Sequence, residues 1–212
     1  PDVGAALQEL LDEQVKTQGI LGMVMAVRLE DGTVVSKSSG YLEPDEKDAW
    51  TMDTQSALGS ITKTFTAVVI MQLIDEGKLS LDDTIDSWFP DQPNSNNITL
   101  RMLLSHTSGI ANYISGENVM DSKWTEEWSP LELVAEANKL EPVDEPGSEV
   151  AHYSNTNYIL LGLVIEKITG NNWEDEVRSR IIEPLELKNT TFLGEAGVWD
   201  GSMVLGYAKA EG

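Results

Sequence analysis

Two patterns of apolar spacing open the chain. Apolar side chains recur three and four positions apart over residues 2–17, and Gly19 follows as a stop signal, which predicts an amphipathic helix. Residues 23–28 and 33–35 are rich in strand formers and flank Asp31-Gly32, a dipeptide typical of tight hairpins. A helix followed by an antiparallel hairpin predicts a sheet with one face covered by that helix.

From Ser60 onwards the pattern is mostly helical. A nearly all-apolar helix is predicted from Ser60 to Gly77, and we expect it to be buried on every side because it has no polar face. Further predicted helices run from Thr99 to Leu104, from Ser129 to Leu140, from Tyr158 to Ile168 and from Asn172 to Ile182. Residues 112–127 are polar and are predicted to form a surface loop.

These elements predict a mixed α/β (α+β) fold, in which a helix-covered antiparallel sheet accompanies a mainly helical region. Residues 1–58 would form the first part of the sheet region, residues 59–195 the helical region, and residues 196–212 a return towards the sheet. A two-stranded sheet is marginal alone, and only short strand candidates such as 203–205 follow the last helix. Either the hairpin packs entirely on helices or further strands lie outside these residues.

The charge of the chain excludes several kinds of partner. Its 36 acidic and 14 basic residues give a net charge of −22, which repels phosphates, so neither nucleic acid nor membrane insertion is expected. The acidic residues are spread along the chain, and adaptation to high salt is one hypothesis, which full stability at low salt would refute. No apolar run has membrane-spanning length, and the first residues carry no signal-peptide pattern. With no cysteine and two separated histidines, no metal site is expected.

Candidate chemistry begins at the predicted start of the long apolar helix. Ser60 and Lys63 are three positions apart, a spacing that stacks their side chains on one helix face. An ammonium in an apolar helix needs a partner, and a hydroxyl needs a neighbouring base to become a nucleophile. The Ser-x-x-Lys pattern alone is weak, because a capping serine followed by a surface lysine looks the same.

A second candidate, Tyr153-Ser154-Asn155, lies between a Pro-Gly turn and another apolar helix. It contributes a phenol and a carboxamide to the same candidate site. The alternative interpretation is structural: Asn155 caps the helix and Tyr153 packs beside it.

Together the two motifs resemble those of the penicillin-recognising serine hydrolases. The chain is most similar to the branch that contains class C β-lactamases, soluble D-alanyl-D-alanine carboxypeptidases and related esterases. The resemblance extends over nearly the whole chain and is carried by residues 57–67, 73–83, 103–109, 146–147 and 153–158.

This resemblance implies acyl transfer without a cofactor. Ser60 would attack an amide, lactam or ester carbonyl, Lys63 would help to remove its proton, and Tyr153 would relay a proton to the leaving group and later activate water. Asn155 would bind the amide carbonyl of the substrate, and the backbone N–H of Ser60 would supply half of an oxyanion hole. Whether Lys63 or Tyr153 is the base in acylation stays open, as do peptide, β-lactam and ester substrates, with a D-Ala-D-Ala carboxypeptidase-like activity favoured.

The family's third motif, Lys or His followed by Thr or Ser and then Gly, lies on a late strand and binds the substrate carboxylate. His106-Thr107-Ser108-Gly109 comes before Tyr153, between two predicted helices, and is therefore rejected as that motif. The resemblance thus implies that the chain is the N-terminal part of the domain. A C-terminal segment of the same protein would complete it, and activity would be low without that segment. It also implies a periplasmic or secreted location, with the cytoplasm left open.

Two other functions compete with this interpretation. A Ser-His-Asp hydrolase needs a Gly-x-Ser-x-Gly elbow and a late histidine, but Ser60 lacks the second glycine, and His152 is expected to be a loop or packing histidine. A non-catalytic binding or regulatory module would keep the fold but would form no covalent adduct.

Overall fold

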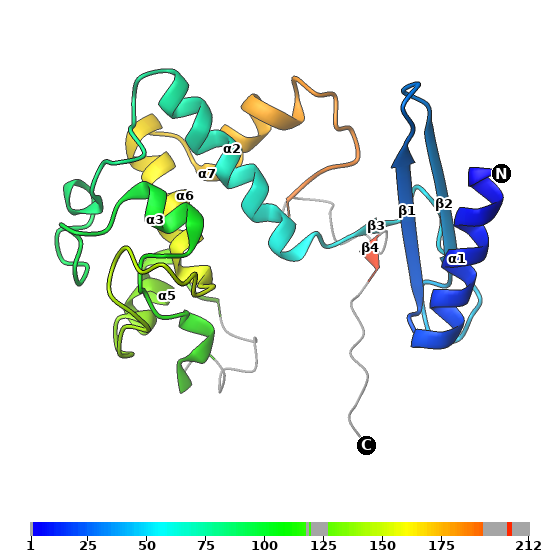
Figure 1. Ribbon diagram of the computed structural model, residues 1–212, viewed down its shortest axis with the longest axis horizontal. Coiled ribbons are helices and arrows are strands. Elements are labelled where there is room, and N and C mark those ends of the chain that lie inside the picture. The colour runs from blue at the N-terminus through cyan, green and yellow to red at the C-terminus, as the bar shows by residue number, and fades with distance from the viewer. Residues whose placement is uncertain (1, 118, 120–126, 193–202, 205–212) are drawn as a thin grey trace. The chain divides into compact units, whose positions relative to one another are not determined.

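The computed structural model describes residues 2–117, 119, 127–192 and 203–204 (Figure 1). The chain divides into two compact units, one made of Pro1–Leu58 with Thr191–Gly212 and the other of Gly59–Thr190. The helices are α1 (Val3–Gln18), α2 (Thr62–Asp75), α3 (Leu100–Ser105), α5 (Pro130–Ala137), α6 (Asn155–Thr169) and α7 (Trp173–Val177). The strands are β1 (Gly22–Arg28), β2 (Val34–Gly40), β3 (Gln55–Ser56) and β4 (Met203–Val204).

The first unit contains the predicted hairpin and its covering helix. β1 and β2 pair antiparallel from Gly22 opposite Gly40 to Arg28 opposite Val34, and α1 packs against β2 (Figure 1). Local signals explain both elements. The side chain of Asp2 caps α1 and Gly19 ends it in the left-handed conformation, while the Asp31 carboxylate accepts the Thr33 N–H in the hairpin turn.

A second, parallel pairing in this unit joins distant parts of the chain. Gln55 of β3 lies opposite Met203 of β4, and Ser56 lies opposite Val204. The short strand candidate at 203–205 is therefore confirmed at its first two residues. Nothing in the pattern indicated β3, because two polar residues carry no strand periodicity.

The second unit is helical and is centred on α6. Helices α2, α3 and α5 all contact α6, whose Leu160, Leu161, Val164 and Ile165 are fully buried. The expectation that α2 is buried on every side is wrong, because Val68 and Met71 are 39% and 44% exposed. An apolar helix can leave one face uncovered, and periodicity alone does not show which neighbours are present.

Several helix boundaries differ from the predicted ones. Thr99 caps α3 as expected, and the helix ends at Ser105, one residue beyond the predicted Leu104, with His106 following in the left-handed conformation at a φ of 61°. Ser129 caps α5 through a capping box, and the helix ends at Ala137 instead of Leu140. Helix α6 begins three residues earlier than predicted, at Asn155.

The last predicted helix continues in a different form. Asn172 precedes α7, but its side chain makes no capping hydrogen bond. After Val177 the backbone forms a π-helical turn, Arg178–Ile182. The mixed α/β fold predicted from the sequence is confirmed. No helix in the described part of the chain is long and apolar enough to cross a membrane.

Candidate active site

The second unit brings four of the predicted side chains into one hydrogen-bonded cluster. Ser60 lies in the turn Gly59–Ile61 just before α2, and Lys63 lies in the first turn of α2. Lys63 Nζ donates to Ser60 Oγ at 3.1 Å and to Asn155 Oδ1 at 2.6 Å. Tyr153 OH donates to Ser60 Oγ at 2.8 Å. Ser60 Oγ therefore contacts an amine and a phenol at once.

Local backbone geometry places each partner of this cluster. Gly59 has a φ of +54°, a conformation that glycine adopts without strain, and it turns the chain into α2. On α2 the three-residue spacing puts the Lys63 side chain beside Ser60. Tyr153 is 54% exposed, so about half of this residue is open to solvent.

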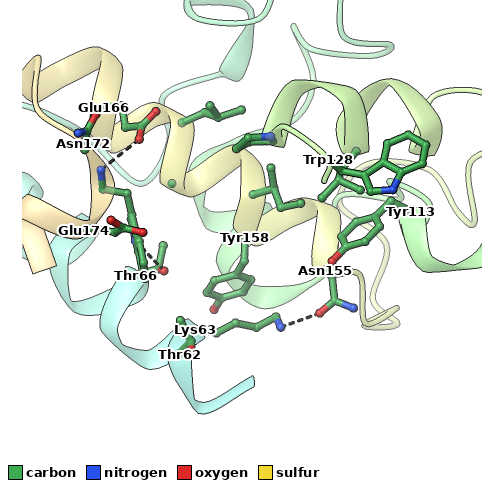
Figure 2. Close-up of a pocket in the computed structure, with 16 residues that line it drawn as sticks. Thr62, Lys63, Thr66, Tyr113, Trp128, Asn155, Tyr158, Glu166, Asn172 and Glu174 are labelled. Atoms are coloured by element: carbon green, nitrogen blue, oxygen red, sulfur yellow. Dashed lines mark hydrogen bonds between the residues drawn. The ribbon is translucent and has the colours of Figure 1, made fainter. Parts of the chain in front are cut away.

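The carboxamide of Asn155 is held from two sides. Its Oδ1 accepts from Lys63, and its Nδ2 donates to Asn112 Oδ1 at 3.3 Å. Its backbone N–H also donates to Asn112 Oδ1, at 3.3 Å. The alternative in which Asn155 caps α6 is wrong, because the N-cap residue is Ser154. The Asn155 side chain is instead directed to Lys63, as Figure 2 shows.

The charges around Tyr153 favour its ionised form. Hydrogen bonding with the Lys63 ammonium, and then with the Ser60 hydroxyl, lowers the pKa of Tyr153 below its ordinary value. Burial, and then the charge of Tyr153, raise the pKa values of Tyr113 and Tyr158. Of these three phenols, Tyr153 is the one whose pKa is lowered.

The predicted packing histidine pairs with an acid away from Ser60. His152 Nε2 lies 3.1 Å from Asp144 Oδ2. The group that contacts the Ser60 hydroxyl is the neighbouring Tyr153. This geometry does not support a Ser-His-Asp relay through His152.

Two polar residues of the site were missed by the sequence reasoning. Asn112 orients Asn155, and His106 accepts a hydrogen bond from the Ser154 N–H through Nδ1 at 3.2 Å. Both lie 40 or more positions before their partners. No spacing rule could connect them, although His106 stands in a segment that carried the family resemblance.

A cavity of about 540 Å³ lies beside Lys63 and Asn155 (Figure 2). This volume falls within the range of small-molecule sites. Aromatic and apolar walls come from Tyr113, Trp128, Leu133, Tyr158, Ile159, Leu163 and Trp173. Glu166 and Glu174 also line it. Within the described ranges no three His, Asp or Glu side chains are grouped to hold a metal.

Known proteins are similar to this chain in sequence and fold. Residues 7–201 match the family model described as Beta-lactamase. Penicillin-binding protein 4 of Amycolatopsis lactamdurans is 33% identical over 193 residues, which cover 89% of this chain and 49% of that protein.

Two solved structures are also similar. A D-stereospecific amidohydrolase from Streptomyces sp. has 36% identity and a TM-score of 0.77, covering 89% of this chain and 56% of that one. The D-amino acid amidase of Ochrobactrum anthropi SV3, complexed with D-phenylalanine, has 33% identity and a TM-score of 0.80, covering 88% and 51%. The chain spans about half the length of these relatives. By its family match and these relatives, it belongs to the Beta-lactamase family, in the serine β-lactamase and penicillin-binding protein superfamily.

Proposed function

We propose that the protein is a serine hydrolase that forms an acyl-enzyme on amides of D-amino acids, with D-alanyl-D-alanine peptides as the favoured substrate. One observation carries the proposal: Ser60 Oγ lies within hydrogen-bond distance of both Lys63 Nζ and Tyr153 OH. A serine hydroxyl in contact with two groups that can take its proton is the arrangement that nucleophilic catalysis requires. The similarity to a D-stereospecific amidohydrolase and to a D-amino acid amidase favours amides of D-amino acids over esters.

In the first step the Ser60 Oγ–carbonyl bond forms and the hydroxyl proton passes to Tyr153 or Lys63. The lowered pKa of Tyr153 supports its part in this transfer. Collapse of the tetrahedral adduct breaks the carbonyl–nitrogen bond, and the same pair returns a proton to the leaving amine. Water then repeats the sequence on the ester, releasing the acid and free Ser60.

Asn155 retains a donor for the substrate. An amide nitrogen carries two N–H groups, and Asn112 accepts from Nδ2. The other N–H is proposed to bind the amide carbonyl of the substrate. The Ser60 N–H, in the turn that opens α2, is proposed as one oxyanion donor.

A C-terminal segment of the same protein is proposed to supply the second oxyanion donor and the group that binds the substrate carboxylate. A periplasmic or secreted location accompanies the proposal, and it rests on the family resemblance alone. Comparing the hydrolase activity of the 212-residue chain with that of the full-length protein tests whether the C-terminal segment is needed. Equal activities of the two would refute the need for a completing segment.

Covalent labelling of the full-length protein with a fluorescent penicillin tests the mechanism. We expect an adduct that Ser60→Ala abolishes and that the matched variant Ser179→Ala retains, since the Ser179 hydroxyl, just after α7, donates only to the backbone carbonyls of Asp175 and Glu176 within that helix. An adduct that survives Ser60→Ala, or saturable binding without any adduct, would refute the proposal in favour of a binding module. Parallel assays with a D-Ala-D-Ala peptide, D-phenylalanine amide, nitrocefin and a nitrophenyl ester then rank the substrates.

A further inference from the structure

His106 joins the end of α3 to both sides of Tyr153. Its Nδ1 accepts from the Ser154 N–H at 3.2 Å, and its carbonyl oxygen accepts from the His152 N–H at 2.8 Å. The Asn157 carboxamide lies 3.3 Å from the same Nδ1. The residues immediately before and after Tyr153 are therefore both hydrogen-bonded to one histidine.

The ring of His106 also supports the exposed phenol. The His106 and Tyr153 ring centroids lie 4.6 Å apart with the planes tilted by 36°. On another side His106 contacts Tyr158, at 5.3 Å between centroids, and Tyr158 OH is anchored on the Leu104 carbonyl at 3.1 Å. Because Tyr153 is 54% exposed, few other contacts can hold its ring in place.

These contacts require a defined protonation state. A ring nitrogen that accepts from an N–H carries no proton, so neutral His106 has its proton on Nε2. A proton on Nδ1 would replace the acceptor by a donor facing the Ser154 N–H and would break that contact. Asn157 could turn its amide oxygen towards such a proton, but the backbone N–H of Ser154 cannot invert.

The surroundings favour the neutral form of His106. Burial, and then the positive charge of Lys63, lower the pKa of His106. The titratable groups that face it are Lys63 from α2, Tyr153 just before α6 and Tyr158 on α6. The Asp144–His152 pair lies on the loop whose backbone His106 binds.

We propose that neutral His106 is a positioning residue that holds Tyr153 against Ser60, so that acylation requires an unprotonated Nδ1 at this histidine. The inference rests on the proposed function, because it assigns a role in the same acylation step. Its contribution is geometric: His106 touches neither Ser60 nor the substrate carbonyl but sets where the phenol stands.

Two variants separate the acceptor from the rest of the side chain. The left-handed φ of 61° is tolerated by asparagine and glycine, so His106→Asn and His106→Gly both suit the backbone. Asparagine Oδ1 occupies nearly the position of histidine Nδ1 and does not titrate. We expect His106→Gly to lower the acylation rate by about tenfold to a hundredfold, as for a misplaced catalytic group. His106→Asn is expected to lose less activity than His106→Gly at pH 8, since it keeps the acceptor while losing the ring contact with Tyr153.

The pH dependence of the acylation rate tests the role of Nδ1, because a purely structural role of His106 would leave that pH dependence unchanged. In the wild type, acylation is expected to decrease as the pH falls through the pKa of His106, below the usual value of about 6.5. His106→Asn should lose this acidic limb and His106→Gly should be uniformly slow. An unchanged acidic limb in His106→Asn, or equal losses in the two variants, would overturn the proposal.

One further measurement distinguishes failure of the His106 proposal from failure of the proposed serine-hydrolase function. Nitrogen NMR of the His106 ring reports the tautomer without any substrate, and we expect the proton on Nε2 at pH 8. A proton on Nδ1 would overturn the inference even if wild-type labelling at Ser60 were normal. Absence of wild-type labelling would instead refute the serine-hydrolase proposal, and with it any role for His106 in acylation. Thermal unfolding of each variant shows that rate losses do not reflect unfolding.

Discussion

Replacement of Tyr153 by phenylalanine removes one oxygen atom from the site. That oxygen lies 2.8 Å from Ser60 Oγ, and the ring that carries it is 54% exposed. The ring contact with His106 remains, and a solvent-accessible hydrogen bond contributes about 1 kcal/mol or less to folding. The variant should therefore fold almost as stably as the wild type.

The effect on catalysis should be far larger. A positioned acid–base group accelerates a reaction by about 10²- to 10⁴-fold, which corresponds to roughly 3–5 kcal/mol in the activation free energy. We expect Tyr153→Phe to lower kcat and kcat/KM together within that range, because proton transfer is required in the transition state and not for binding.

Stopped-flow acylation of the full-length protein with a chromogenic substrate, together with thermal unfolding, measures both quantities. Tyr41→Phe is the matched control, since Tyr41 lies in the other unit and pairs with Ala49 in the backbone. A loss of less than about threefold in Tyr153→Phe would refute its role in proton transfer. A loss accompanied by unfolding would instead show that the hydroxyl serves stability.

Three further predictions follow from the second unit. Asn112→Ala should lower kcat/KM by about tenfold, because the Asn155 carboxamide loses its hydrogen-bond acceptor. Asn112→Asp keeps an acceptor and should lower kcat/KM less. Equal losses in the two variants would contradict this prediction. Gly109→Ala should lower the free energy of unfolding, measured in urea, by more than about 2 kcal/mol. The reason is that φ is +75° and that the new Cβ would lie 2.0 Å from the backbone oxygen of Asp144. A smaller loss would show that the loop adapts. Hydrogen bonds from Arg180 and Lys78 lower the pKa of Glu76 to about 2. The stability that this carboxylate contributes is therefore present above pH 4.5 and is lost as the pH falls towards 2. Glu76→Gln should make the thermal unfolding temperature less dependent on pH over that window, and an unchanged pH dependence would refute this prediction.

Much of the fold followed from local signals. The cap at Asp2, the stop at Gly19 and the Asp31-Gly32 turn each act over a few residues, so α1 and the hairpin could be predicted. Ser129 followed by Pro130 likewise marked the start of α5. The end of α3 lies one residue beyond the predicted Leu104, and it is a histidine, His106, that adopts the left-handed conformation after it.

Only part of the candidate site could be predicted from such local signals. The spacing of Ser60 and Lys63 places them together on any helix, so their contact follows from helix geometry. Tyr153 and Asn155 were associated with them through family resemblance, because no periodicity links residues about 90 positions apart. Asn112 and His106 were not identified, since a polar residue in a loop gives no indication of its distant partner.

By itself, then, the sequence determined the local elements, the charge of the chain and the serine–lysine pair, because each depends on neighbouring residues or on composition. The exposed face of α2, the pairing of β3 with β4, and the hydrogen bonds of His106 with Ser154 and of Asn112 with Asn155 depend on tertiary packing. These features arise from packing between segments far apart in the chain. Hydrogen bonds across such contacts form only where the packed backbones bring donor and acceptor within about 3 Å.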